Sequence, residues 1–171
     1  MNKLELQQLS LSDGKDIYDM LQQIGPSENA FNNEVNGMSY EQYQEWLKKM
    51  DDWSRGEQLP NGYVKQWIYW LIDNNTPVGF GKLRERATEA SKKFGGNIGY
   101  AIDPFYRGKG YGNRLFGLLL LEAKKKQIHE VYSTVEKYNF SSKKVHEKCG
   151  GRLINEDEIR WYFLFDIKNN D

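Results

Sequence analysis

The stretch from residue 97 to residue 114 limits the possible fold more than any other part of this chain. It opens with a short run of apolar and β-branched residues that ends at Asp103-Pro104, and a long apolar segment starts at Leu115. Between them lies a turn with glycines at three alternate positions: Gly108, Gly110 and Gly112. This order predicts a strand, a glycine-rich turn and the N-terminus of a helix.

Such a turn is typical of sites that bind anions through the backbone. Free N–H groups in the turn and at the start of the helix can point at a phosphate, and the helix dipole favours negative charge there. Glycines let the backbone approach a ligand closely and adopt positive φ angles. Three side chains add positive charge: Arg107, Lys109 and Arg114. The stretch therefore predicts a site for a phosphorylated ligand.

The spacing of the glycines excludes two common nucleotide sites. A dinucleotide fold requires G-x-G-x-x-G and an acidic residue at the end of a second strand, and the chain has G-x-G-x-G without that residue. A Walker P-loop requires Gly-Lys-Ser/Thr after its spacer, which is missing. The three glycines alone leave a plain connector open as the alternative.

The segments that follow also have a regular order. Residues 115–123 are apolar nearly all round, which predicts a helix packed against a sheet, and residues 129–135 alternate like a strand. A second helix is predicted from Asn139 or Ser141, either of which can cap it, to Gly150, which suits a helix C-terminus.

Two motifs in this order resemble those of the GNAT superfamily of N-acetyltransferases. Arg107-x-x-Gly110-x-Gly112 is similar to the acyl-CoA signature Gln/Arg-x-x-Gly-x-Gly/Ala, and the Ile-Gly-Tyr-x-Ile-x-Pro before it is similar to the family's central strand. The family's second motif is Asn-x-x-Ser/Ala, then Tyr four residues on, then Gly-Phe. Its positions fall here on Asn139, Ser142, His146 and Gly150. The resemblance covers roughly residues 66 to 166.

This resemblance implies both a fold and a donor. The fold is α/β (α+β), with a mixed, mostly antiparallel central sheet flanked by helices. Because the sequence shows no repeats, linkers or low-complexity tracts, a single domain over residues 1–171 is expected. Acetyl-CoA is the implied co-substrate, and an amine of a small molecule or an exposed protein amine attacks its thioester directly. A backbone N–H near Ile102 would stabilise the oxyanion, and the turn would hold the pyrophosphate. The residues implied in CoA binding are Ile102, Arg107, Gly108, Lys109, Gly110, Tyr111, Gly112, Asn139 and Ser142.

The chain departs from the family at two positions. The tyrosine thought to protonate the leaving thiolate is His146, and the usual Gly-Phe is Gly150-Gly151. Ser142 and His146 are four residues apart on one helix, so His146 is predicted to face the same cleft and to act as the acid. The alternative is a histidine without a chemical role. The missing tyrosine also motivates a second function, a catalytically silent acyl-CoA-binding or sensor protein.

An alkylamine is mostly protonated at neutral pH, so the reaction needs a general base. Four residues are candidates: Glu28, Glu34, Glu85 and, through a water molecule, Asn97. Glu28 and Glu34 lie in the region that usually shapes the acceptor site in the family, and the segment 27–32 resembles that of a bacterial subgroup of acetyltransferases. Glu28 is taken as the catalytic base. The alternative is that these carboxylates are only solvated charges.

The charge distribution and composition limit the classes of ligand and partner that the chain can have. Residues 1–60 carry 5 Lys/Arg against 11 Asp/Glu, whereas residues 61–171 carry 19 against 13. A basic half suits a ligand with several phosphates, and an acidic half could attract a cationic amine. Dispersed lysines argue against nucleic acid as a partner. With two histidines and only Cys149, no metal site is expected.

A cytoplasmic protein without membrane contact is expected, because no run of 18 apolar residues and no signal-peptide pattern are present. The remaining predicted elements are a strand over 4–11, a helix to Ile24, an irregular polar segment over 27–38, a helix from Ser39, a loop over 51–62, a hairpin over 66–84 and a final strand over 159–167. That last aromatic strand could form a homodimer edge.

Overall fold

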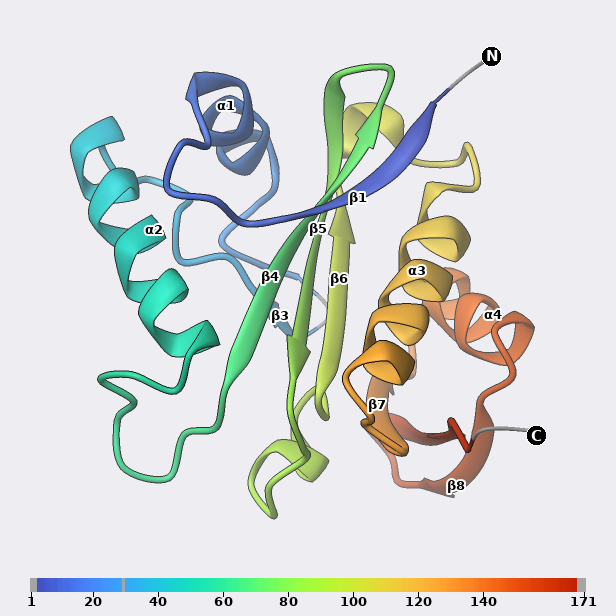
Figure 1. Cartoon of the computed structure of the whole chain (residues 1–171). Coiled ribbons are helices and arrows are strands. Elements are labelled where there is room, and N and C mark those ends of the chain that lie inside the picture. The colour runs from blue at the N-terminus through green and yellow to red at the C-terminus, as the bar shows by residue number, and fades with distance from the viewer. Residues whose placement is uncertain (1–2, 29, 169–171) are drawn as a thin grey trace.

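The computed structural model describes residues 3–28 and 30–168, so Asn29 of the segment 27–32 lies outside the described residues (Figure 1). Two antiparallel sheets form the frame. The first has the order β1-β4-β5-β6, with β1 (Leu4–Gln8), β4 (Gln66–Asp73), β5 (Thr76–Arg84) and β6 (Ile98–Ile102). The second has the order β7-β9-β8, with β7 (Glu130–Glu136), β9 (Arg160–Asp166) and β8 (Arg152–Glu156).

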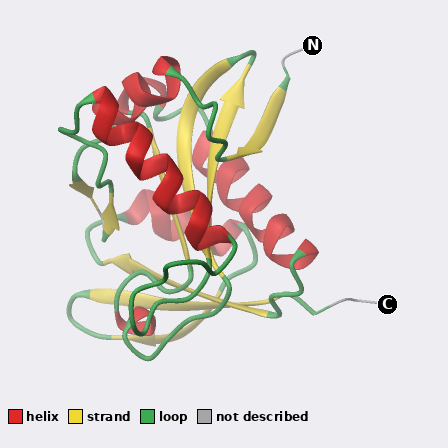
Figure 2. Ribbon diagram, turned by 60° about the vertical axis from the view of Figure 1, so that its left-hand side comes forward, coloured by secondary structure: helices red, strands yellow, loops and turns green. Residues whose placement is uncertain are grey.

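Helices cover both faces of the first sheet. One face carries α1 (Lys15–Gln23) and α2 (Tyr40–Ser54), and the other carries α3 (Tyr111–Lys125), which packs against α4 (Phe140–Lys148) (Figures 1 and 2). Side chains on a strand alternate between faces. On β4 the residues Ile68, Trp70 and Ile72 are therefore buried under α1 and α2, while Tyr69 and Leu71 are buried under α3.

The local signals explain where several elements begin and turn. Ser39 and Gln42 form a reciprocal capping box at the start of α2. Asn74 and Asn75 both have positive φ between β4 and β5, as a tight hairpin turn requires. The predicted α/β fold, with a mostly antiparallel sheet flanked by helices, is confirmed. Among the described residues every strand pair is antiparallel, and the strands divide into two main sheets instead of one mixed sheet.

Several predicted boundaries were wrong. β1 ends at Gln8 rather than residue 11, and α2 continues to Ser54 into the predicted loop. The polar segment over 27–38 contains a small hairpin of β2 (Ser27–Glu28) and β3 (Phe31–Asn32). Phe31 packs edge-on against Phe80, with ring centres 4.9 Å apart, and the buried Asn33 side chain donates to the Leu21 and Ile24 carbonyls at 2.8 Å. Contacts with distant residues therefore order this segment.

The prediction of a dimer edge on the last strand was also wrong. β9 lies between β7 and β8 and pairs with both, so its backbone hydrogen-bonding groups are not free to pair with a second molecule. The outer strands of this sheet are β7 and β8. β8 was not predicted, and its five residues are all exposed. The short sequence of β8 has two adjacent apolar residues instead of an alternating pattern, which explains why it was missed.

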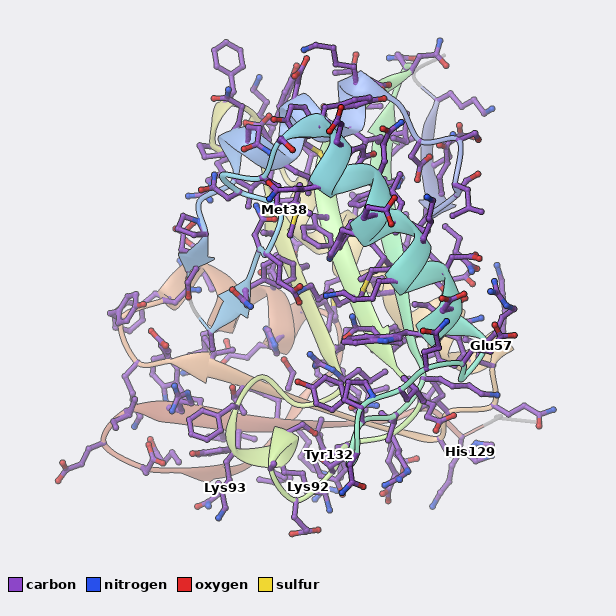
Figure 3. All side chains as sticks on the ribbon, turned by 90° about the vertical axis from the view of Figure 1, so that its left-hand side faces the viewer. Met38, Glu57, Lys92, Lys93, His129 and Tyr132 are labelled. Atoms are coloured by element: carbon purple, nitrogen blue, oxygen red, sulfur yellow. The ribbon has the colours of Figure 1, made fainter. Side chains whose placement is uncertain are left out.

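The two sheets meet just before β6. Asn97 is fully buried, its backbone N–H donates to the Tyr132 carbonyl at 2.9 Å, and its side-chain oxygen accepts from the Tyr132 N–H at 2.7 Å. Lys92, in the loop before β6, lies 4.8 Å from the centre of the Tyr132 ring (Figure 3). Beyond this junction β6 pairs with β5 and β7 pairs with β9, so the two strands follow different sheets.

Candidate active site

The glycine turn adopts the conformation that its sequence requires. Asp103 accepts a hydrogen bond from the Phe105 N–H at 2.9 Å and starts the turn at the end of β6. Gly108 and Gly110 have φ of 77° and 83°, and Gly110 leads directly into α3 without a side-chain cap. A Cβ added at either glycine would meet nothing within 4 Å. Both glycines are therefore required by the backbone conformation, and the N-terminal N–H groups of α3 are left without a side-chain partner at the cap.

The two motifs come together at Tyr100. β6 turns Tyr100 toward α3, and its ring lies edge-on to Phe116 with centres 5.6 Å apart. A Cβ at Gly112 would lie 3.3 Å from the Tyr100 ring, and the Tyr100 hydroxyl donates to the Ser142 hydroxyl of α4 at 3.2 Å. Gly112 of the first motif and Ser142 of the second thus contact the same side chain. Sequence reasoning missed Tyr100, since the strand pattern alone gives no reason to single it out.

Arg107 and Glu28 also lie together. The Arg107 guanidinium donates to both Glu28 carboxylate oxygens, at 3.0 and 2.6 Å, and its Nε donates to the Ile102 carbonyl at 3.1 Å. Both side chains are about half exposed, so the pair stabilises the fold by at most about 1 kcal/mol. The pair instead fixes the position of the β2–β3 hairpin, because it joins this hairpin to the predicted phosphate-binding turn.

The other predicted CoA residues lie around the same end of β6. Asn139 caps α4 by accepting from the Ser142 N–H at 3.1 Å. The Tyr111 hydroxyl donates to the Asp73 carboxylate at the β4–β5 turn, so it points away from Ser142. Lys109 is exposed, with its amine 5.3 Å from the centre of the Tyr106 ring.

His146 does not face the surface that Ser142 shares with Tyr100, contrary to the sequence prediction. It is 2% exposed and lies among the rings of Phe116, Phe163 and Phe165. Its Nδ1 is 2.7 Å from the Ser142 carbonyl and its Nε2 is 2.6 Å from the Ser133 hydroxyl. A carbonyl only accepts, so Nδ1 carries the proton and Nε2 accepts from Ser133.

Burial lowers the pKa of His146 to about 4, because the charged imidazolium loses its hydration among the aromatic rings. The imidazole is therefore neutral at physiological pH and both of its nitrogens are occupied. A helix in isolation places His146 beside Ser142, but the tertiary packing of α4 on β7 turns the histidine inward. These contacts give it the role of a core residue that joins α4 to β7.

Asn97 and Glu34, two other candidates for the base, make structural contacts, and the structure explains the glycine at position 151. The Asn97 side chain is used at the sheet junction, and Glu34 pairs with Lys49 of α2 at 3.0 Å. A Cβ at Gly151 would lie 2.7 Å from the Phe165 ring. Phe165 of β9 thus fills the space beside this position, which explains why a larger residue is not accommodated there.

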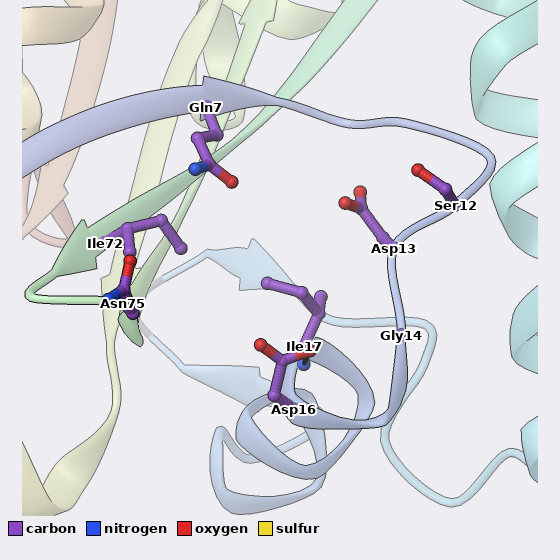
Figure 4. A pocket seen from close by; sticks show the side chains of 8 residues that line it. All are labelled: Gln7, Ser12, Asp13, Gly14, Asp16, Ile17, Ile72 and Asn75. Carbon is purple, nitrogen blue, oxygen red and sulfur yellow. Dashed lines mark hydrogen bonds between the residues drawn. The ribbon is translucent and has the colours of Figure 1, made fainter.

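A separate polar pocket lies between β1 and α1, on the sheet face opposite α3 (Figure 4). Its lining residues are Gln7, Ser12, Asp13, Gly14, Asp16, Ile17, Ile72 and Asn75. Asp13 accepts from the Trp70 indole at 2.7 Å and from the Ser10 N–H at 2.8 Å, and burial raises the pKa of its carboxyl. These bonds give Asp13 a structural role in holding the β1–α1 loop.

Two further searches concern residues 3–28 and 30–168 only. Within these ranges, no three His, Cys, Asp or Glu side chains are grouped so that they could hold a metal ion. None of the helices in the same ranges has the length and apolar character needed to cross a bilayer.

The sequence matches the acetyltransferase (GNAT) family over residues 19–151. The chain belongs to the GNAT family. The [ribosomal protein bS18]-alanine N-acetyltransferase of Haemophilus influenzae is 32% identical over 108 residues, which are 63% of this chain and 68% of that enzyme. The predicted enzyme class, an acetyl-CoA-dependent N-acetyltransferase, is thereby confirmed.

Solved structures of GNAT enzymes share the fold at low sequence identity. The ribosomal-protein-S5-alanine acetyltransferase of Vibrio fischeri has a TM-score of 0.75 and 16% identity, over 97% of this chain and 94% of that one. The N-acetyltransferase PseH of Campylobacter jejuni, in complex with acetyl coenzyme A, has a TM-score of 0.62 and 12% identity, over 97% of this chain and 100% of that one.

Proposed function

We propose that this GNAT enzyme transfers the acetyl group of acetyl-CoA to a primary amine, either of a small molecule or of a protein N-terminus. Names of similar enzymes support this choice of acceptors. They include ribosomal-protein alanine acetyltransferases and the spermidine N-acetyltransferase of Vibrio cholerae. The acidic N-terminal part of the chain, which forms α1 and α2, agrees with a cationic acceptor.

The position of β6 carries this proposal. On one face of the strand, Tyr100 contacts Gly112 and Ser142 from the two donor motifs. On the other face, Phe31 of the hairpin packs so closely that a Cβ at Gly99 would be 3.1 Å from its ring. β6 is therefore the strand at which the two donor motifs and the N-terminal hairpin meet. This arrangement suits direct transfer beside β6, without an enzyme-bound intermediate.

In this proposal the predicted residues keep distinct roles. The backbone N–H groups from Arg107 to Gly112 hold the pyrophosphate at the start of α3, and Asn139 and Ser142 contact the pantetheine arm. The thioester oxygen would take a backbone N–H near Ile102. His146 is a positioning residue for α4, and Glu28 is the base that accepts the proton of the attacking amine. No metal takes part in these steps.

We also propose that residues 1–171 act as one domain, in the cytoplasm of a bacterium. If a homodimer forms through an edge of this sheet, β8 is the strand that would pair, because β9 is paired on both sides and β7 is joined to Asn97.

Release of free CoA thiol in the presence of an amine panel tests the proposed function. Alanine-terminated peptides and polyamines represent the two acceptor classes, and acetyl-CoA binding is measured separately by thermal stabilisation. A ligand at 100 times its dissociation constant adds about 2.7 kcal/mol of stability. Turnover with either class supports the proposal. Binding without turnover on every amine would instead favour the silent CoA-binding function.

Gly110→Val is expected to weaken acetyl-CoA binding about tenfold or more. A β-branched residue strongly disfavours the φ of 83°, so the turn must change its backbone and the direction of its N–H groups. Isothermal titration with acetyl-CoA measures the loss. Gly117→Ala, in the middle of α3 where a Cβ meets nothing within 4 Å, is the control and should bind normally.

Glu28→Gln is expected to lower kcat about 100-fold, the usual contribution of a general base. Acetyl-CoA affinity should change only a few-fold, because the half-exposed pair with Arg107 contributes little energy. Steady-state kinetics with both substrates separate the two effects. Glu34→Gln is the matched control, as Glu34 pairs with α2 instead. Equal kcat values for the two variants would remove Glu28 from the role of base.

A further inference from the structure

We propose that the Tyr100 hydroxyl, rather than a group on α4, donates the proton that the CoA sulfur takes up as the thioester breaks. This inference rests on the proposed function, because it assigns a group to the leaving thiol of that reaction. It replaces the acid that the sequence predicted at His146.

The first argument is the position of Tyr100 between the two donor motifs. Its hydroxyl is 3.2 Å from the Ser142 hydroxyl, and its ring packs beneath Gly112 at the start of α3. Glycine at position 112 leaves room for this ring, because a Cβ there would lie 3.3 Å from it. A pantetheine arm that runs from the α3 N-terminus past Ser142 must pass this phenol.

The second argument comes from the position that carries tyrosine in the family. His146 is one helical turn beyond Ser142, and the Ser142 hydroxyl is 3.4 Å from its Nδ1. The imidazole is buried, neutral and bonded at both nitrogens, so it has no proton to give to a ligand on the donor side. Tyr100 brings a phenol to the same Ser142 from β6, across from α4.

The third argument is the protonation state of the phenol. Burial raises the pKa of Tyr100, so the hydroxyl keeps its proton at neutral pH and can donate it. The other titratable groups nearby are the Cys149 thiol and the His146 imidazole, both from the α4 segment, and neither is charged at neutral pH. Tyr111 offers no comparable donor, because its hydroxyl is bonded to Asp73.

The step balances without any further reactant. The amine nitrogen forms a bond to the acetyl carbon, the C–S bond breaks, and its electron pair stays on sulfur. The Tyr100 O–H proton passes to sulfur and gives the free CoA thiol. The nitrogen loses one proton to the base, and the Tyr100 phenolate regains a proton through solvent. The products are the acetylated amine and CoA.

Tyr100→Phe tests the role by separating turnover from binding. We expect kcat to fall about 100-fold, as for loss of a general acid, while the acetyl-CoA dissociation constant stays within about twofold. Tyr69→Phe is the matched control. Tyr69 is buried on the same side of the sheet but lies on β4, outside both donor motifs, so kcat should not change.

A second measurement needs no acceptor. The bound CoA thiol is titrated by its thiolate absorbance, with the complex of desulfo-CoA as the blank to remove the signal of Cys149. A phenol that donates to sulfur stabilises the thiolate, so Tyr100→Phe should raise the pKa of the bound thiol, whereas Tyr69→Phe should leave it unchanged.

The outcomes distinguish this inference from the proposed function. An unchanged kcat and an unchanged thiol pKa in Tyr100→Phe would overturn the role of Tyr100 while leaving the transferase intact. Parallel loss of binding and turnover would show instead that Tyr100 is a wall of the donor site. Failure of the wild-type protein to bind CoA would overturn both. A raised thiol pKa in an enzyme that acetylates none of the amines would support the Tyr100–sulfur contact and count against the acceptor classes alone.

Discussion

Gly96→Ala is expected to destabilise the protein by about 3 kcal/mol or more, a large share of the total stability of a domain of this size. A Cβ at this position would lie 1.9 Å from the Tyr132 carbonyl oxygen and 2.4 Å from its carbon. These are backbone atoms of β7, so they cannot move without breaking the Asn97–Tyr132 hydrogen bonds that join the two sheets. Urea denaturation followed by circular dichroism measures the loss.

Gly95→Ala is the matched control for this experiment. Gly95 has φ of 80°, close to the 70° of Gly96, but the nearest atom to an added Cβ is 3.8 Å away. The control therefore carries the same conformational strain, about 1 kcal/mol, without the collision. Equal destabilisation by the two substitutions would show that strain, and not the close approach of the sheets, requires glycine at position 96.

The second large effect is the loss of stability in acid through His146. Its folded-state pKa of about 4 is below the value of about 6.5 expected in the unfolded chain. Between these values the unfolded chain binds more protons. The contribution of His146 is therefore complete above about pH 6.5, decreases as the pH falls and is lost near pH 4. The expected decrease is about 3 kcal/mol, because each pKa unit corresponds to about 1.4 kcal/mol.

Urea denaturation at several pH values, compared with His146→Gln, isolates this contribution from that of the carboxylates. The variant should be less stable at neutral pH, and its stability should fall less steeply between about pH 6.5 and about pH 4. His129→Gln is the control, because His129 is exposed at the start of β7 (Figure 3) and should keep the pH dependence of the wild type. Parallel curves for His146→Gln and the wild type would contradict the buried, neutral state of His146.

Much of the fold could be predicted from local patterns. The hairpin of β4 and β5, the strand–turn–helix of the glycine motif and the capped α4 all depend on residues close in sequence. The short strands could not be predicted in this way. β3 exists because Phe31 packs on Phe80, and β8 exists because it pairs with β9, so both depend on contacts with distant residues.

The features of the candidate site also differ in how far local sequence could predict them. The donor turn was predictable because a glycine motif determines its own backbone, and the observed positive φ angles at Gly108 and Gly110 agree with it. The pairing of Arg107 with Glu28 joins residues 79 positions apart, and no local pattern contains it. The sequence could not predict the direction of the His146 side chain either. Helix geometry places it beside Ser142, whereas the packing of α4 on β7 turns it into the core.

The sequence by itself determined the family, the donor and the turn that would hold its phosphates, because glycine spacing and helix caps act over a few residues. Only the tertiary structure decided which side chains share the donor side of β6. Tyr100 reaches Ser142 there because two sheets and two helices converge around one strand. His146 lies in the core because α4 packs on β7, and this burial in turn favours the neutral imidazole. Contacts of this kind depend on packing between distant segments, which local sequence patterns do not encode.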